Sequence, residues 1–186
     1  MSKLIIVGLI FLLSCNSNSQ TNSEVVKTVD KSYKISVDRF LLDKSIPQIS
    51  KDLYLEKVKP TDNNETLAIL DSINSTGQAR EFYFLVITKT MKYADGAYAE
   101  PLGIVAKEFV EKNTTEFLSY FMNNQDLLSN EDFKNWASSV YSEIQIDSEG
   151  SEQNAVNDLQ AKMKNNCKGQ TKKFTTRIDE FIGLMK

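Results

Sequence analysis

Residues 82–87, with the sequence FYFLVI, are the most apolar run after residue 15 and constrain the fold more than any other segment. Six such residues in succession are compatible with a buried strand or with a helix that is buried on every side. The surrounding residues 78–93 contain no glycine or proline, and the neighbouring segments have helical patterns. We therefore predict a central helix here, whereas a strand would place a sheet in the core.

The segments before this run indicate three shorter helices. Residues 37–41 suggest the first, and the second begins near Pro47, because proline is favoured at a helix start. Asn63 or Asn64 can cap the third. Each of these helices is short enough to need a neighbour for its apolar face.

Capping and breaking signals indicate the helices that follow. Asp95 and Gly96 end the central helix, and Pro101 is expected in the first turn of the next one. Residues 113–116 (NTTE) have the form of a capping box, so another helix begins there. Ser129 can cap a longer helix whose apolar residues keep the helical period for three turns.

The C-terminal part of the chain predicts two further helices. One spans residues 152–167, and the last carries Phe174, Ile178, Phe181, Ile182 and Met185 on one side. Consecutive short helices joined by tight polar turns favour antiparallel neighbours. The expected fold class is therefore all-α, an irregular helical bundle or stacked antiparallel helical pairs in a single domain, residues 24–186. No repeat of fixed period is present, so a HEAT-like superhelix is an analogy only.

The N-terminus has the layout of a secretory signal peptide. Lys3 precedes ten apolar residues, 4–13, and a polar stretch follows from Asn16. Ten helical residues cover about 15 Å, whereas the hydrocarbon core of a bilayer is about 30 Å thick. The segment is therefore too short to span a membrane.

The end of this leader, Leu12-Leu13-Ser14-Cys15, resembles the lipobox of bacterial lipoproteins. The resemblance covers only the first 15 residues. It implies that residues 1–14 are removed and that Cys15 becomes the acylated first residue; an ordinary signal peptide that is cut nearby is the alternative. Several acyl chains anchor a protein firmly, because each buried CH₂ contributes about 0.8 kcal/mol.

The lipobox resemblance also implies a location in the bacterial cell envelope, with the membrane bound through the lipid on Cys15. Residues 15–23 are polar after the cysteine and are expected to be a flexible tether. Asn16 is not the aspartate that resembles an inner-membrane retention signal in some enteric bacteria. The outer membrane is therefore favoured, and the leaflet stays open.

Composition excludes several classes of function. Loss of Lys3 with the leader changes the net charge from -3 to -4. Nucleic acid and anionic membrane surfaces favour a basic protein, so neither is expected to be the main partner. The absence of histidine excludes Ser-His-Asp and Cys-His sites and histidine-ligated zinc or haem. No GxGxxG, Walker A, GxSxG, HExxH, CxxC or SxxK motif is present. We therefore expect no cofactor and no metal.

The second cysteine, Cys167, has no partner for an internal disulfide once Cys15 carries lipid. It follows Ala155, Leu159 and Met163 at steps of four residues, which indicates the apolar stripe of a helix. A free cysteine there behaves as a small hydrophobic residue. A reactive or intermolecular thiol is the alternative.

Two charged segments have both a functional and an ordinary interpretation. Residues 147–152 (DSEGSE) share the charge of a calcium loop, but their glycine is the fourth residue and the twelfth is Asp158, so a solvated turn is expected. Six basic residues follow Asp158 without an intervening acid, and they can meet phosphate or an acidic partner or simply stabilise a helix C-terminus. They are Lys162, Lys164, Lys168, Lys172, Lys173 and Arg177.

The turn at residues 93–100 (YADGAYAE) is the predicted binding loop, with Tyr93, Asp95, Tyr98 and Glu100 as candidate residues. Tyrosine offers a large rigid contact area at low entropic cost, and loops on rigid scaffolds often carry recognition. The alternative is that both tyrosines pack onto the core.

Two functions are compatible with these features. We expect a lipid-anchored, non-catalytic envelope protein that binds an unknown protein partner, such as an immunity or inhibitor protein or an envelope adaptor. The alternative is a small histidine-free hydrolase that acts on cell-wall or glycan material through carboxylates, with Glu81, Asp95 and Glu100 as candidates. A carrier of an apolar ligand between the helices is a third hypothesis.

Overall fold

The computed structural model describes residues 33–185 with the exception of 76 and 78. The leader, Cys15 and the tether lie outside the described residues, as does the beginning of the expected domain at residues 24–32. The predictions for these segments therefore stay predictions.

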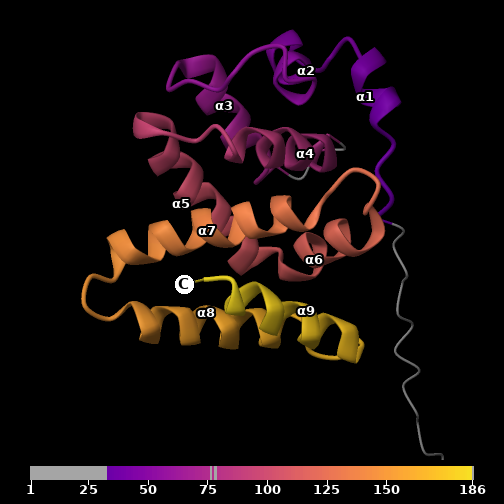
Figure 1. The fold of residues 1–186 in the computed structure, drawn as a ribbon. Helices are drawn as coiled ribbons and strands as arrows, with labels where there is room; N and C mark the ends of the chain where they lie inside the picture. The colour runs from indigo at the N-terminus through magenta and orange to yellow at the C-terminus, as the bar shows by residue number, and fades with distance from the viewer. Residues whose placement is uncertain (1–32, 76, 78, 186) are drawn as a thin grey trace, which may run out of the picture. The chain divides into compact units, whose positions relative to one another are not determined.

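The described residues contain nine helices and no strand, which confirms the all-α fold class (Figure 1). The helices are α1 (Val37–Leu42), α2 (Gln48–Tyr54), α3 (Asn64–Ser72), α4 (Arg80–Met91), α5 (Gly96–Lys112), α6 (Thr114–Asn123), α7 (Asn130–Asp147), α8 (Glu152–Asn166) and α9 (Lys172–Gly183).

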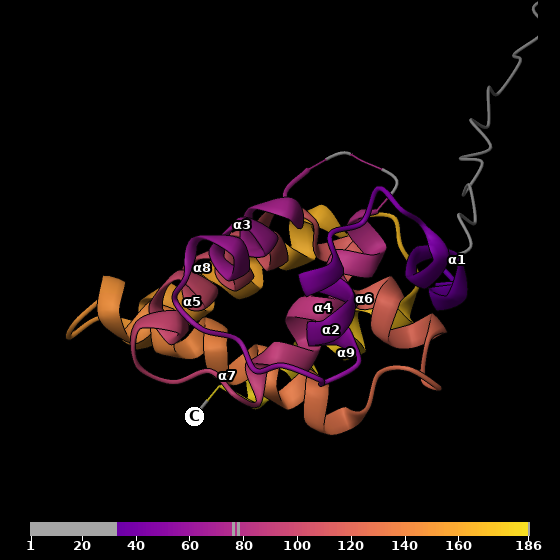
Figure 2. The same ribbon diagram turned by 90° about the horizontal axis from the view of Figure 1, so that it is seen from above.

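The helices between Ser32 and the C-terminus form layers around α4 and α7. Helices α2 and α3 pack on α4, and α4 in turn packs on α7. On the other side of α7, α8 and α9 form an antiparallel pair (Figure 1). The view from above shows α2 and α3 lying over α4 and α5 (Figure 2). This arrangement is an irregular helical bundle.

Helix α4 is the central helix that residues 82–87 predict. Phe82, Phe84, Leu85, Val86 and Ile87 all have no exposed surface. A helix that is apolar on every side needs neighbours on every side, and α4 contacts α2, α3 and α7. The choice of a helix over a buried strand is therefore confirmed.

Buried hydroxyls in the second half of α4 connect it to its neighbours. Thr88 donates to the Phe84 carbonyl at 2.8 Å and accepts from Trp136 Nε1 at 2.8 Å. Thr90 Oγ1 lies 2.9 Å from the Tyr98 hydroxyl. Because unpaired polar groups are costly in a core, these bonds fix how α4 meets α5 and α7.

The start of α5 differs from the prediction. The helix begins at Gly96, so Pro101 is its sixth residue and not part of its first turn. Tyr98 explains the difference, because its side chain is only 3% exposed and its hydroxyl meets Thr90. Burial of this ring holds the preceding turn in helical conformation despite the hydrogen bond that proline cannot donate.

The predicted capping box at residues 113–116 is also wrong, although α6 begins where it was expected. Asn113 makes no capping bond with its side chain. The Glu116 carboxylate instead accepts hydrogen bonds from Arg80 Nη1, at 2.9 Å, and from the Tyr120 hydroxyl. Glu116 therefore joins α6 to the start of α4, and it is no longer available to cap its own helix.

The caps of α3 and α7 form as their sequences predict. Asn63 is the residue that caps α3, and its side chain accepts a hydrogen bond from the Thr66 amide at 2.9 Å. Ser129 and Asp132 form a reciprocal capping box at the start of α7. Local sequence determines both helix starts, because each bond joins residues three positions apart.

An extended segment at residues 33–36 is held against the end of α6 by one buried amide. The Asn124 side chain accepts from the Ile35 amide at 2.7 Å and donates to the Tyr33 carbonyl at 2.6 Å. It also donates to the Tyr120 carbonyl at 2.9 Å. This contact fixes the beginning of the described chain to the bundle.

Candidate functional site

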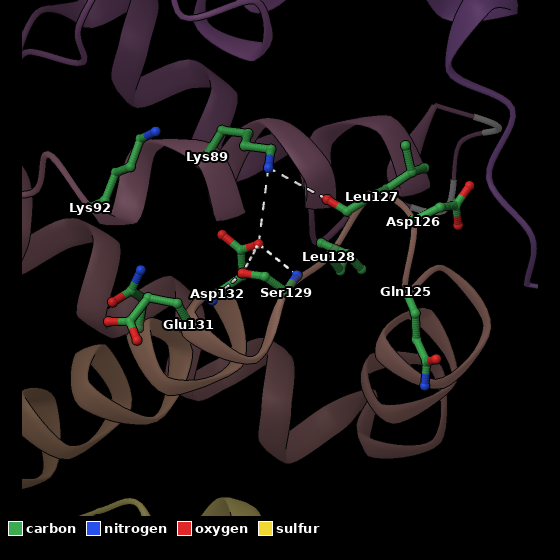
Figure 3. Close-up of a pocket in the computed structure, with 10 residues that line it drawn as sticks. Lys89, Lys92, Gln125, Asp126, Leu127, Leu128, Ser129, Glu131 and Asp132 are labelled. Carbon is green, nitrogen blue, oxygen red and sulfur yellow. Dashed lines mark hydrogen bonds and ion pairs between the residues drawn. The ribbon is translucent and has the colours of Figure 1, made fainter.

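A groove with a volume of about 660 Å³ lies between α4 and the start of α7 (Figure 3). Its third side is the connection between α6 and α7, residues 124–129. The groove is lined by Lys89, Lys92, Gln125, Asp126, Leu127, Leu128, Ser129, Glu131, Asp132 and Asn135. The lining thus holds charges of both signs: Lys89 on α4 and Lys92 just after it, Asp126 on the connection, and Glu131 and Asp132 on α7. Of these acids, Asp132 lies near Lys89, whereas Asp126 pairs with Lys34.

The centre of the groove is held by fixed hydrogen bonds. Asp132 Oδ2 accepts from the backbone amide and the hydroxyl of Ser129, both at 2.8 Å. Lys89 Nζ lies 3.9 Å from the same oxygen and 3.4 Å from the Leu127 carbonyl, as Figure 3 shows. Because Lys89 joins α4 to the connection, it positions this wall of the groove.

The outer end of the groove leads to a charged cluster around Glu56. Lys92 Nζ donates to Glu56 Oε2 at 2.6 Å, and the Tyr93 hydroxyl donates to the same atom at 2.9 Å. These two bonds lower the pKa of Glu56, that from Lys92 most. The bond to Glu56 in turn raises the pKa of Lys92, so both groups are charged at neutral pH.

Two features single out this Glu56 cluster. Lys59 and Lys92 place their ammonium groups 5.3 Å and 5.0 Å from the centre of the Tyr93 ring, within the range of cation–π attraction. Glu56 has a φ of 56°, which costs free energy in any residue but glycine. The hydrogen bonds from Lys92 and Tyr93 help to offset that cost.

The structure separates the four residues of the predicted binding loop. Tyr93 lies in the Glu56 cluster beside the groove. Asp95 is exposed at the start of α5, and Glu100 is exposed within it. Tyr98 is a core residue, bonded to Thr90, and offers no surface for recognition. None of the four lines the groove, and Tyr93 is connected to it only through Glu56, which bonds to both Tyr93 and the lining residue Lys92.

The three carboxylates proposed for a hydrolase are not brought together. Glu81 lies in the first turn of α4 and pairs with Arg39, whereas Asp95 follows the other end of this 12-residue helix, about 18 Å away. Glu100 instead lies near Glu143 on α7, whose pKa is raised by burial first and by neighbouring acids second. Sequence reasoning missed Glu143, which occupies an ordinary position in a helix.

The structure places Cys167 in the core, Lys162 and Lys164 in ion pairs, and the acidic turn at the surface. Cys167 is only 7% exposed, and burial raises the pKa of its thiol. Lys162 pairs with Glu111 at 3.2 Å and Lys164 with Asp179 at 2.8 Å. The turn at 147–152 is exposed over most of its length and joins α7 to α8.

In the part of the chain that the structure describes, no group of three or more His, Cys, Asp or Glu side chains is placed to hold a metal ion. None of its helices is both long enough and apolar enough to cross a membrane.

Comparison of this chain with protein-family models, with curated proteins and with solved structures found no match. Function is therefore argued from the groove and from the chemistry of its walls.

Proposed function

We propose that this protein is a lipid-anchored, non-catalytic binding module of the bacterial cell envelope and that a protein partner docks at the groove between α4 and α7. The observation that carries this proposal is the groove lining, which combines the cations Lys89 and Lys92 with three acids, Asp126, Glu131 and Asp132. Such a surface can pair with charges of both signs on a partner. Charge complementarity of this kind gives a binding site specificity and a fast association rate.

A protein partner fits the groove better than a small molecule. Sites for small ligands are mostly apolar and enclose most of the ligand. In this groove only Leu127 and Leu128 are apolar, and Leu128 is buried beneath the surface. Charged groups that stay accessible to solvent can pair with charged side chains that a folded protein partner already holds in a fixed position.

The groove residues are also well prepared for binding. Asp132 is fixed by Ser129, and Lys92 by Glu56, so these side chains lose little further entropy when a partner arrives. Tyr93 adds a half-buried ring next to these charges. Tyrosine is among the residues that are enriched where proteins meet.

The lipid on Cys15 supplies the second part of the proposal, because it would keep the binding domain at a membrane surface, with the outer membrane favoured. An immunity or inhibitor protein, or an adaptor for an envelope assembly, would work from such a position. Labelling of growing cells with radioactive palmitate tests the anchor. Label should enter the wild-type protein and not a Cys15→Ala variant, and equal labelling of both would contradict the proposal.

A charge reversal tests the groove. Glu131 lines it, is exposed, and has only a 3.8 Å pairing with Lys134, so Glu131→Lys should leave the fold intact. Glu149→Lys changes the charge equally in the turn after α7, away from the groove. Each full-length variant is cross-linked in cells with a short reagent and then purified.

We expect a discrete protein adduct with the wild type and with Glu149→Lys, and a loss of at least about tenfold in its yield with Glu131→Lys. An adduct that both variants retain, or that both lose equally, would contradict docking at the groove.

A further inference from the structure

A second cavity, of about 340 Å³, lies on the other side of the α6–α7 connection. Its walls come from the end of α6, the start of α7 and the start of α9. The lining residues are Phe121, Met122, Gln125, Leu128, Ser129, Asn130, Lys173 and Arg177. No acid is among them, although the chain carries a net charge of -3.

The cations of this cavity, Lys173 and Arg177, lie one helical turn apart on α9 and therefore on the same face. Lys173 is exposed, and no carboxylate of the described residues forms an ion pair with it. The Arg177 guanidinium lies 3.9 Å from the centre of the Phe133 ring and gives one N–H to Glu180. Arg177 thus forms an ion pair with Glu180, and a guanidinium carries five N–H groups, of which this pair uses one.

The position of Lys173 is unfavourable in the absence of an anion. The first turn of α9 contains no acid, and its first two residues are Lys172 and Lys173. Cations in this position are repelled by the positive end of the helix dipole. An anion between Lys173 and Arg177 would relieve that repulsion.

Apolar side chains close the other side of the cavity. Phe121 and Leu128 are buried in the core, and Met122 is half-buried beside them. The amides of Gln125 and Asn130 add neutral hydrogen-bonding groups at the rim. A ligand that fits these surfaces has an anionic head with several acceptor oxygens and a small apolar group.

We propose that this cavity is a binding site for an organic phosphate, with the phosphate between Lys173 and Arg177 and its apolar group against the half-buried Met122, above the buried Phe121 and Leu128. A phosphate monoester carries a charge of about -1.5 to -2 at neutral pH and offers three acceptor oxygens. Lys173, Arg177 and the amides of Gln125 and Asn130 supply donors for these acceptors, and Lys173 supplies a cation with no ion pair to a described carboxylate, whereas Arg177 already pairs with Glu180. The cavity shares Gln125, Leu128 and Ser129 with the proposed protein-docking groove, but the argument for a phosphate does not depend on that groove.

Calorimetric titration of the purified full-length protein with phenyl phosphate tests the site. Inorganic phosphate lacks the apolar group, and benzyl alcohol lacks the charge. Dihexanoyl phosphatidic acid carries the same phosphate chemistry on a lipid, so its affinity relative to phenyl phosphate distinguishes a phospholipid headgroup from a free organic phosphate. We expect saturable binding of at least one phosphate ester, weaker binding of inorganic phosphate, and none of benzyl alcohol.

The decisive comparison is Lys173→Gln against Lys172→Gln. Both remove one exposed cation from the same helix start, but only Lys173 lines the cavity. Lys173→Gln should weaken phosphate-ester binding by roughly tenfold, and Lys172→Gln by less than about twofold. Equal effects of the two substitutions, inorganic phosphate that binds as tightly as the esters, or the absence of saturable ester binding would each overturn the proposal.

Discussion

Replacement of Asn124 by alanine is expected to remove the hydrogen bonds that hold residues 33–36 to the bundle. The Asn124 side chain has no exposed surface and makes three bonds, to the Ile35 amide and to the Tyr33 and Tyr120 carbonyls. The Tyr120 carbonyl keeps a partner, because it also accepts from the Asn124 backbone at 3.1 Å. The Ile35 amide and the Tyr33 carbonyl each lose one.

The size of the effect follows mainly from the Ile35 amide. A buried polar group that is left unpaired costs about 1–3 kcal/mol. Ile35 is a buried residue, so its amide should bear this cost in full, and the bond from Asn124 to the Tyr33 carbonyl is lost as well. We therefore expect Asn124→Ala to lower the free energy of unfolding by about 3 kcal/mol, a large part of the stability of a domain this size.

Urea denaturation measures this change, with fluorescence of Trp136, the only tryptophan of the sequence, as the signal. Asn123→Ala is the matched control, because Asn123 is the exposed neighbour and the substitution should change stability by less than about 0.5 kcal/mol. Hydrogen exchange at the Ile35 amide should accelerate in Asn124→Ala alone. A loss below about 1 kcal/mol, or unchanged protection of Ile35, would refute the reasoning.

Three further outcomes are expected. The pKa of Glu143 is raised in the fold, so the stability that this group contributes is present below its unfolded pKa of about 4.3 and is lost as pH rises through the folded pKa. Glu143→Gln should therefore stabilise the protein at pH 7, as measured by thermal denaturation. The gain should vanish below about pH 4. In an NMR titration Glu56 should have a pKa below the usual glutamate value, and Lys92→Met should raise it. Trp136→Phe should cost about 2 kcal/mol in denaturation followed by circular dichroism, because the Thr88 hydroxyl loses the indole donor and a cavity forms.

The sequence predicted helices well wherever the determining contacts are local. The start of α7 depends on Ser129 and Asp132, three residues apart, and its apolar positions keep one period. The sequence did not predict the start of α5 or the absence of a capping box at the start of α6, because both depend on contacts with residues outside the helix start itself. The buried Tyr98 hydroxyl forms a hydrogen bond with Thr90, and the Glu116 carboxylate accepts from Arg80 instead of capping its own helix.

The candidate site was less predictable than the fold. Lys89 and the Leu127 carbonyl meet across the groove although 38 residues separate them in the chain. No periodicity or motif links two such positions. Tyr93 was identified from its loop and its composition, but its partner Glu56 stands in an unremarkable turn after α2.

Site-specific photocross-linking in intact cells tests the docking proposal most directly. A photoreactive amino acid is placed at Asn135, which lines the groove, or at Gln145, which is exposed on the same helix outside the groove. We expect a single defined protein adduct from position 135 and none from position 145. The absence of any adduct from position 135, or the same adducts from both positions, would contradict a partner site between α4 and α7.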